Sequence, residues 1–295
     1  MTSTIHADKI MNSSGDQDSG LDLQTNDQVK LKTANTDRIT VTDATTSISN
    51  DLNVDSGTLF VDASENKVGI KTTTPANYYA DDLVVTAPDE GGITVVGGTA
   101  ERNYLAFADG TSGDARYRGL ISYDHNTDKL GIGAGGGTKI ELDGNGNMTN
   151  ASHPSFQAYY ANNSYCWSDY TDGGSHLQTL NQTRFNKGNH YDTTNHRFIA
   201  PVAGVYSFYG QYYTNYSSNY ARYGAFIYVN GVARSETWIA SWEVAGSATT
   251  ALTIELAAND YVQLYTAVYD GNATGNQYNV YCGAGYTYLN GHLVA

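Results

Sequence analysis

The C-terminal half contains the sequence feature that most constrains the fold. A polar turn at residues 186–192 precedes two stretches whose apolar residues recur at strand-like spacings, among them Phe198, Tyr206 and Phe208. Because successive side chains of a strand point to opposite faces, this pattern predicts paired strands with one buried face. We find no long segment with the 3.6-residue period of a helix.

The composition agrees with an all-β protein. Glycine (31) and tyrosine (25) are abundant, proline is scarce (4), and charged residues make up only 16%. Val, Ile, Thr and Tyr favour pleated, half-buried surfaces, whereas Gly, Asn and Asp favour turns. A chain of 295 residues with 40% hydrophobic residues is long enough for two or more domains with a core.

The charge excludes one class of partner. The net charge is −14 and the pI is near 4.7, so a phosphate backbone would be repelled and we expect no nucleic-acid binding. No run approaches the ~20 apolar residues of a membrane span, so we expect no membrane insertion. The first residues have neither a basic nor an apolar signal region, which predicts synthesis and folding in a cytoplasm.

The two halves differ in composition. Residues 1–150 contain five tyrosines, and residues 151–295 contain twenty, together with all three tryptophans and both cysteines. The change and the nearby Pro154 predict a domain boundary close to residue 150.

The first half repeats itself. Residues 61–70 align without gaps on residues 123–132, and both read as strand, polar turn, strand. Short strands with one weak apolar face cannot bury a core alone and need partners. Three chains wound together would supply them by turning apolar side chains to a shared axis, such as those of Leu23, Val29, Ile39, Val41, Ile48, Leu52 and Val54.

The second half resembles the C1q/TNF-like globular domain. The resemblance covers about residues 152–295 and rests on the chain end, residues 289–294, and on the spacing of Asn186, Tyr191, Phe198, Gly204, Tyr206 and Phe208. Leu180 and Leu289 stand where the family has Phe, and Gly210 stands where it has an aromatic residue. The resemblance implies a jelly-roll head that works as a homotrimer. It also brings the first and last strands together, so Cys166 and Cys282 either form a disulfide or remain two buried thiols.

Residues 1–150 resemble the shafts of bacteriophage tail fibres, including those of marine phages. The segments that carry this resemblance are residues 59–75 and 107–119. It implies an intertwined trimeric β-shaft with short β-repeats. We therefore expect a virion-attachment segment and start of the shaft at 1–58, a β-repeat shaft at 59–150, and the head at 151–295.

The sequence contains only incomplete motifs for catalysis or metal binding. The glycine-rich residues 131–137 lack the Gly-Lys-Ser/Thr ending of a phosphate loop, and residues 143–154 lack the glycine and glutamate of a calcium loop. No Gly-x-Ser-x-Gly motif is found, so we expect no enzyme.

We also expect no cofactor and no bound metal. His190 and His196 flank one turn but show no paired metal-ligand spacing. Some C1q-like heads bind calcium, and carboxylates are present for it, although their spacing selects no site: Asp169, Asp172, Glu236, Glu243 and Asp270.

Tyrosine is the positive signal for binding. Aromatic side chains with a polar tip suit both saccharides and protein interfaces. We assign Tyr206 and Phe208 to the core, and Tyr209 and Tyr213 to the trimer interface. The remaining candidates for ligand contact are Tyr216, Tyr220, Arg222, Trp238, Trp242 and Tyr269.

These features predict a homotrimeric phage fibre that is part of the virion. Its N-terminus would join a tail or capsid protein, and its head would adhere to a host-surface polysaccharide or lipopolysaccharide. Two alternatives stay open: a purely structural trimerisation protein, and a bacterial surface adhesin.

Overall fold

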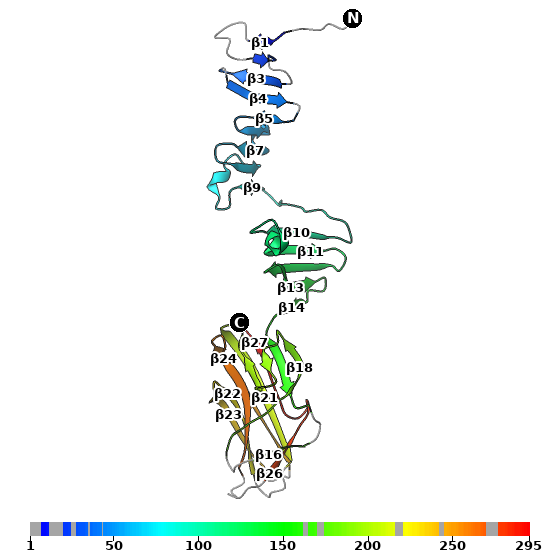
Figure 1. The fold of residues 1–295 in the computed structure, drawn as a ribbon, viewed down its shortest axis with the longest axis vertical. Helices are drawn as coiled ribbons and strands as arrows, with labels where there is room; N and C mark the ends of the chain where they lie inside the picture. The colour runs from blue at the N-terminus through cyan, green and yellow to red at the C-terminus, as the bar shows by residue number, and fades with distance from the viewer. Residues whose placement is uncertain are drawn as a thin grey trace. The chain divides into compact units, whose positions relative to one another are not determined.

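The computed structural model describes residues 7–11, 20–24, 28–34, 36–42, 44–161, 165–169, 174–215, 221–241, 245–269 and 277–295. Within these ranges every regular element is a β-strand or a short 3-10 helix, as predicted for an all-β protein (Figure 1). None of these elements is a helix able to span a membrane. The chain divides into two compact units, Met1–Val96 and Gly97–Ala295.

The first unit begins with an antiparallel sheet in which each strand pairs with the next. Its strands are β1 (Lys9–Met11), β2 (Gly20–Asp22), β3 (Gln28–Thr33), β4 (Thr36–Thr42) and β5 (Thr46–Ile48). In β3, Val29 and Leu31 are exposed on one face, and Lys30 and Lys32 lie on the other. Cross-strand pairing extends this apolar face into one continuous row: Ile10, Leu21, Leu31, Ile39 and Ile48.

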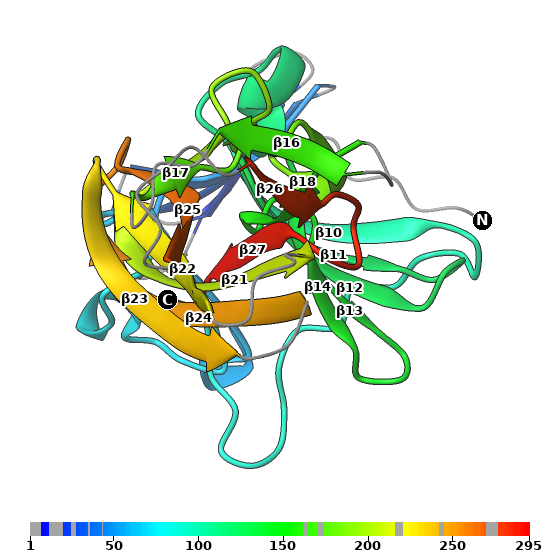
Figure 2. The same ribbon diagram turned by 90° about the horizontal axis from the view of Figure 1, so that it is seen from below.

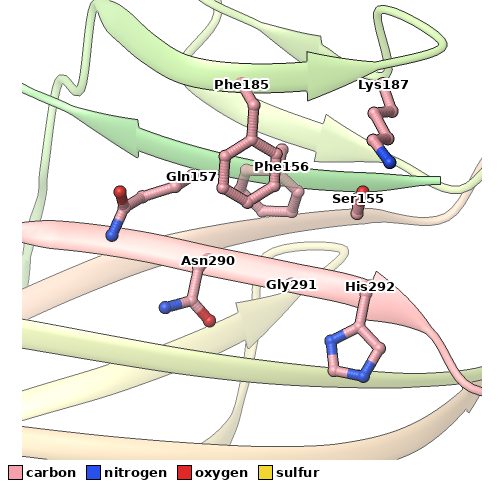
Figure 3. Close-up of a pocket in the computed structure, with 8 residues that line it drawn as sticks. All are labelled: Ser155, Phe156, Gln157, Phe185, Lys187, Asn290, Gly291 and His292. Carbon is pink, nitrogen blue, oxygen red and sulfur yellow. The ribbon is translucent and has the colours of Figure 1, made fainter. Parts of the chain in front are cut away.

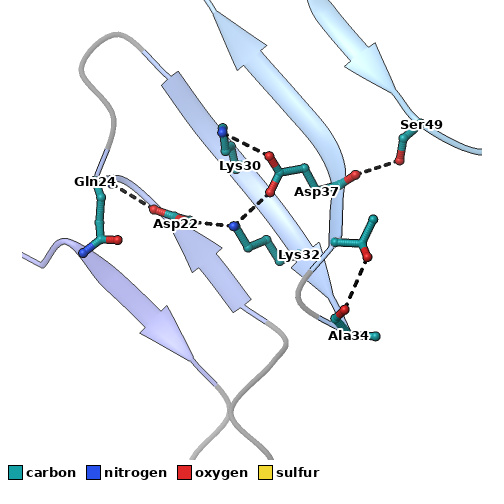
Figure 4. Close-up of polar contacts among 8 residues, drawn as sticks. Asp22, Gln24, Lys30, Lys32, Ala34, Asp37 and Ser49 are labelled. Carbon is teal, nitrogen blue, oxygen red and sulfur yellow. Dashed lines mark hydrogen bonds and ion pairs between the residues drawn. The ribbon is translucent and has the colours of Figure 1, made fainter.

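The opposite face of this sheet is charged. Lys32 bridges two carboxylates, with its Nζ 3.0 Å from Asp37 and 3.2 Å from Asp22 (Figure 4). Lys30 adds a second contact to Asp37 at 3.0 Å. The ammonium groups of Lys32 and Lys30 hold the pKa of Asp37 below its usual range. A single chain thus satisfies its charges and leaves its apolar row uncovered.

A smaller sheet completes the first unit. It contains β6 (Leu52–Val54), β7 (Leu59–Asp62), β8 (Lys67–Ile70) and β9 (Leu83–Val85), the last pair being parallel. Its buried side chains include Phe60 and Val84. β6 pairs with β7 across residue 58, and the expected division of the chain at 58 and 150 stays a prediction.

The second unit opens with another sequential antiparallel sheet. Its strands are β10 (Arg102–Phe107), β11 (Gly119–Asp124), β12 (Lys129–Ala134), β13 (Gly137–Asp143) and β14 (Met148–Asn150). One face again carries an apolar row, formed by Leu105, Ile121, Ile132 and Ile140. Leu105, Ile121 and Ile132 are 59%, 42% and 49% exposed.

One turn occurs in three hairpins. In each, an aspartate accepts hydrogen bonds from backbone N–H groups two and three residues later, and the fourth residue after it has a positive φ. The aspartates are Asp62, Asp124 and Asp192. The first two of these hairpins lie in the repeated segments 61–70 and 123–132. The third copy lies between β19 (Tyr191–Asp192) and β20 (Arg197–Ile199).

Residues 155–293 form two further sheets. The β21 sheet contains β16 (Tyr165–Asp169), β26 (Gln277–Tyr281), β21 (Gly204–Asn215), β27 (Tyr288–Leu293), β15 (Ser155–Tyr159), β18 (Gln182–Lys187) and β24 (Ala245–Leu256). The β25 sheet contains β19, β20, β25 (Tyr261–Tyr269), β22 (Ala221–Val229), β23 (Val232–Ser241) and β17 (His176–Leu177).

The strand order is that of a jelly roll. In chain order, the principal strands are β15, β20, β21, β22, β23, β24, β25 and β27. In one sheet the first strand (β15) pairs with the eighth (β27), the eighth with the third (β21), and the third with the sixth (β24). In the other sheet the second strand (β20) pairs with the seventh (β25), the seventh with the fourth (β22), and the fourth with the fifth (β23). Figure 2 shows β21 beside β27 and β24, and β22 beside β25 and β23. Two interleaved sheets of this order define the jelly roll.

An aromatic core lies between the two sheets. Phe156 stacks on Phe198 with ring centroids 4.9 Å apart, and on Tyr191 at 5.0 Å. Tyr206 and Phe208 are 0% and 2% exposed, which confirms their predicted core role. The Tyr206 hydroxyl donates to the carbonyl of Val202 at 2.8 Å, so its polar group is satisfied.

Leu180 and Gly210, two of the positions that depart from the resemblance, lie in the packed interior of the head. Leu180 is fully buried, and its carbonyl accepts a hydrogen bond from the Tyr191 hydroxyl at 3.4 Å. Gly210 faces Leu264, and a Cβ there would lie 2.6 Å from the Leu264 Cδ1 atom. Leu264 of the facing sheet thus occupies the space that a larger side chain at position 210 would need.

The structure describes the side chain of one of the two cysteines. Cys282 is fully buried and disulfide-bonded, so it is not a thiol. Cys166, the only other cysteine, lies in β16, which pairs with β26; its side chain falls outside the described ones.

Candidate functional site

Four strands reach the same end of the jelly roll, and in the chain they border residues 216–220 and 242–244. Asn215 pairs with Ala245, and Ala221 pairs with Ser241, so β21, β22, β23 and β24 end together there. The head begins at the opposite end, where the Leu293 N–H donates to the Pro154 carbonyl. The three loop candidates Tyr216, Tyr220 and Trp242 lie outside the described residues.

The other three candidates share the outer face of the β25 sheet. Arg222 lies directly opposite Tyr269, which is 43% exposed. Trp238 lies opposite Gly224, two residues along β22 from Arg222, and is 42% exposed. The structure therefore brings together side chains that are 47 residues apart in the sequence (269 − 222), because β22 pairs with both β23 and β25.

The Trp238 side chain packs against a buried phenylalanine of the neighbouring strand. Its ring meets that of Phe226 edge-on, with centroids 5.2 Å apart, and Phe226 is only 3% exposed. A Cβ at Gly224 would come within 2.4 Å of the Phe226 ring, so glycine there makes room for it. The indole is thus half exposed to solvent and held by its contact with Phe226, an arrangement that suits stacking on a ligand.

Five tyrosines form a cluster on the outer face of the β21 sheet and the adjoining β26–β27 turn. Tyr209 lies 6.0 Å from Tyr288, and Tyr213 lies 5.2 Å from Tyr281 and 5.7 Å from Tyr286, between ring centroids. Burial raises the pKa of Tyr288, so its hydroxyl stays neutral. This tyrosine cluster contains both residues predicted for the trimer interface, and that role stays a prediction.

A hollow next to Tyr209 was not predicted from the sequence. This β15 hollow has a volume of about 450 Å³. Figure 3 shows Phe185 and Lys187 of β18 on one side of β15, and Asn290 and His292 of β27 on the other. Its lining is Ser155, Phe156, Gln157, Phe185, Lys187, Asn290, Gly291 and His292. In the sequence, only the alternation of polar and apolar residues in β15 and β27 pointed to this hollow. It identifies neighbours only when the pairing of the two strands is known.

The described residues offer no arrangement for a metal ion. They contain no group of three side chains of the metal-ligating types. The Nδ1 atom of His196 lies 3.1 Å from the Leu180 carbonyl, and burial lowers the pKa of His190. Of the five carboxylates considered for calcium, only the Glu236 side chain is described. The expectation of no enzymatic activity stays a prediction.

No family model matches this chain, and no curated protein does. Solved structures similar to it include the globular domain of zebrafish complement 1qA protein, at 15% identity over 48% of this chain and 98% of that one, with a TM-score of 0.32. Eiger TNF from S. frugiperda is similar at 11% identity over 49% and 94%, with a TM-score of 0.36. Murine APRIL is similar at 12% identity over 48% and 99%, with a TM-score of 0.35.

The expected all-β fold with a jelly roll in the C-terminal half is confirmed by the strand order of that half.

Proposed function

We propose that this protein is a homotrimeric bacteriophage tail fibre that adheres to the host surface through its C-terminal head. The observation that carries the trimer is the pair of uncovered apolar rows in the β1–β5 and β10–β14 sheets. Exposed contiguous apolar surface marks an interaction site. Since the opposite face of the first sheet is occupied by its ion pairs, further chains of the same kind would cover the apolar side and enclose a shared core.

The tyrosine cluster supports the same assembly in the head. Aromatic side chains are enriched at interfaces, where they give large contact area with a satisfied polar tip. We assign the outer face of the β21 sheet to subunit contact, with Tyr209 and Tyr213 at its centre. A neighbouring head would then also cover the β15 hollow, whose amide, hydroxyl and ammonium groups would pair across the interface.

We assign adhesion to the outer face of the β25 sheet and to the end of the jelly roll that β21, β22, β23 and β24 reach together. Arg222, Trp238 and Tyr269 provide an aromatic, cationic surface suited to a polysaccharide or lipopolysaccharide. Tyr216, Tyr220 and Trp242 are kept as candidates. Single contacts of this kind are weak, and three heads per fibre raise the avidity through effective concentration. The N-terminal segment would join the fibre to a tail or capsid protein, which makes the virion its location.

The test separates assembly from adhesion in the full-length protein. Labelled protein is applied to host cells with intact or enzymatically stripped surface glycans. Trp238→Ala is expected to keep the trimer and lose cell binding, whereas Tyr213→Ala is expected to weaken the trimer. Equal binding of the wild type to stripped cells would contradict the glycan ligand. Absence of binding to any host cell would favour the alternative of a purely structural trimerisation protein, which the tyrosine cluster also fits.

A further inference from the structure

A second cavity lies in the β10–β14 sheet, away from the head. Its volume is about 530 Å³, and its lining is Arg102, Tyr104, Ala106, Arg116, Tyr117, Leu120, Gly136, Gly137 and Thr138. Tyr104 and Leu120 belong to the strand positions that alternate with the apolar row of Leu105 and Ile121. The cavity therefore opens on the face opposite to the one that we assign to chain association, and it would stay accessible in the trimer.

Its walls combine an apolar floor with oriented aromatic groups. Leu120 is 6% exposed, and Tyr104 is 52% exposed beside it. The Tyr117 hydroxyl donates to Asp114 at 3.0 Å, and Arg102 donates to Asp124 at 2.5 Å. These bonds hold Tyr117 and Arg102 in place before any ligand arrives, which lowers the entropy that binding must overcome.

Arg116 differs from the neighbouring arginines. Arg102 and Arg118 each have a carboxylate partner, at 2.5 Å from Asp124 and 3.6 Å from Asp109 respectively. Among the described residues Arg116 forms no ion pair, and its Nε makes only a long 3.4 Å hydrogen bond to the Gly113 carbonyl. A planar guanidinium facing a cavity is suited to bidentate binding of a carboxylate or phosphate.

Glycine keeps one rim of the cavity open. Gly136 has a φ of +80°, and a Cβ there would lie 3.0 Å from the Asp114 Cβ. Its N–H donates to the Arg118 carbonyl at 3.3 Å and so fixes the β12–β13 turn against the segment that carries Arg116. Gly137 has open space where its Cβ would be. At Gly137 the rim carries no side chain, which leaves room for a sugar ring.

We propose that this cavity binds a sugar residue that carries an acidic group. The pyranose ring stacks between Tyr104 and Tyr117 over the Leu120 floor, and its carboxylate or phosphate pairs with Arg116. Uronic acids and sugar phosphates share this chemistry. The site would give the fibre a glycan contact outside the head, and it does not depend on the head binding a glycan.

Isothermal titration calorimetry with the full-length protein tests the proposal. The probes are oligogalacturonate, mannose 6-phosphate, inorganic phosphate and neutral dextran. At least one acidic saccharide is expected to bind, with dextran not binding and affinity falling as salt rises. Binding of oligogalacturonate alone identifies a carboxylate ligand, and binding of mannose 6-phosphate alone identifies a phosphate. Binding of inorganic phosphate without either saccharide, equal binding of dextran, or no binding at all would overturn the proposal.

Variants locate the binding. Arg116→Gln is expected to weaken it at least 10-fold, and Arg116→Lys to weaken it less, because the charge remains without the planar fork. Arg118→Gln, an arginine outside the cavity, is the matched control and should bind as the wild type does. Trp238→Ala, which tests the head, should leave this affinity unchanged. Unchanged binding by Arg116→Gln with an unchanged melting temperature would place the saccharide elsewhere.

Discussion

The apolar row of the β10–β14 sheet gives the sharpest test of the trimer. Ile132 is central in this row, between Ile121 and Ile140, and is 49% exposed in the single chain. Ile132→Thr keeps the β-branched shape that strands favour but removes apolar surface and adds a hydroxyl. The change should therefore leave the single chain folded and act mainly on association.

The size of the effect follows from the exposure. Full burial of an isoleucine side chain stabilises by ~1.5–3 kcal/mol, so the half of Ile132 that association would cover is worth ~0.7–1.5 kcal/mol per chain. Three chains lose ~2–4.5 kcal/mol together, which corresponds to a roughly 30- to 2,000-fold lower trimer association constant.

Sedimentation equilibrium over a series of protein concentrations measures this constant. Where the wild type stays trimeric throughout, the same comparison is made in guanidinium. Lys139→Thr, at an exposed position of β13 outside the row, is the control and should associate as the wild type does. An association constant for Ile132→Thr equal to that of the wild type would refute the idea that partner chains cover this face.

Three further outcomes are expected. Trp238→Ala should lower cell binding and cost less stability than Phe226→Ala, because the indole is half exposed, whereas Phe226→Ala, at a 3% exposed position, should cost ~3–5 kcal/mol, measured by denaturant unfolding. Because its lysine partners hold the pKa of Asp37 below the usual 3.8, the stabilisation is complete above that pH and is lost as pH falls through the lowered pKa; Lys32→Met should flatten this acid transition, followed by circular dichroism. Cys282→Ser should cost ~2–4 kcal/mol relative to the oxidised protein, and a reducing agent should destabilise the wild type but not the variant.

Local pattern was enough to predict the class of fold. The alternation of Val29, Lys30, Leu31 and Lys32 predicts a strand with one apolar face, and β3 shows that alternation. The spacing of Phe198, Tyr206 and Phe208 likewise predicted the buried face of the head. These features depend on neighbours along the chain, because the two-residue period of a strand is written directly into the sequence.

The surfaces that carry the proposed functions depend instead on register. Arg222, Trp238 and Tyr269 meet on one face only because β22 pairs with both β23 and β25. The β15 hollow likewise joins Ser155 to His292, 137 residues apart (292 − 155), through one cross-strand pair. A shift of one residue in either pairing would turn every such side chain to the other face, so pairing between distant strands decides these sites. The sequence determined which residues could be exposed on a strand, and the tertiary structure alone decided which of them became neighbours.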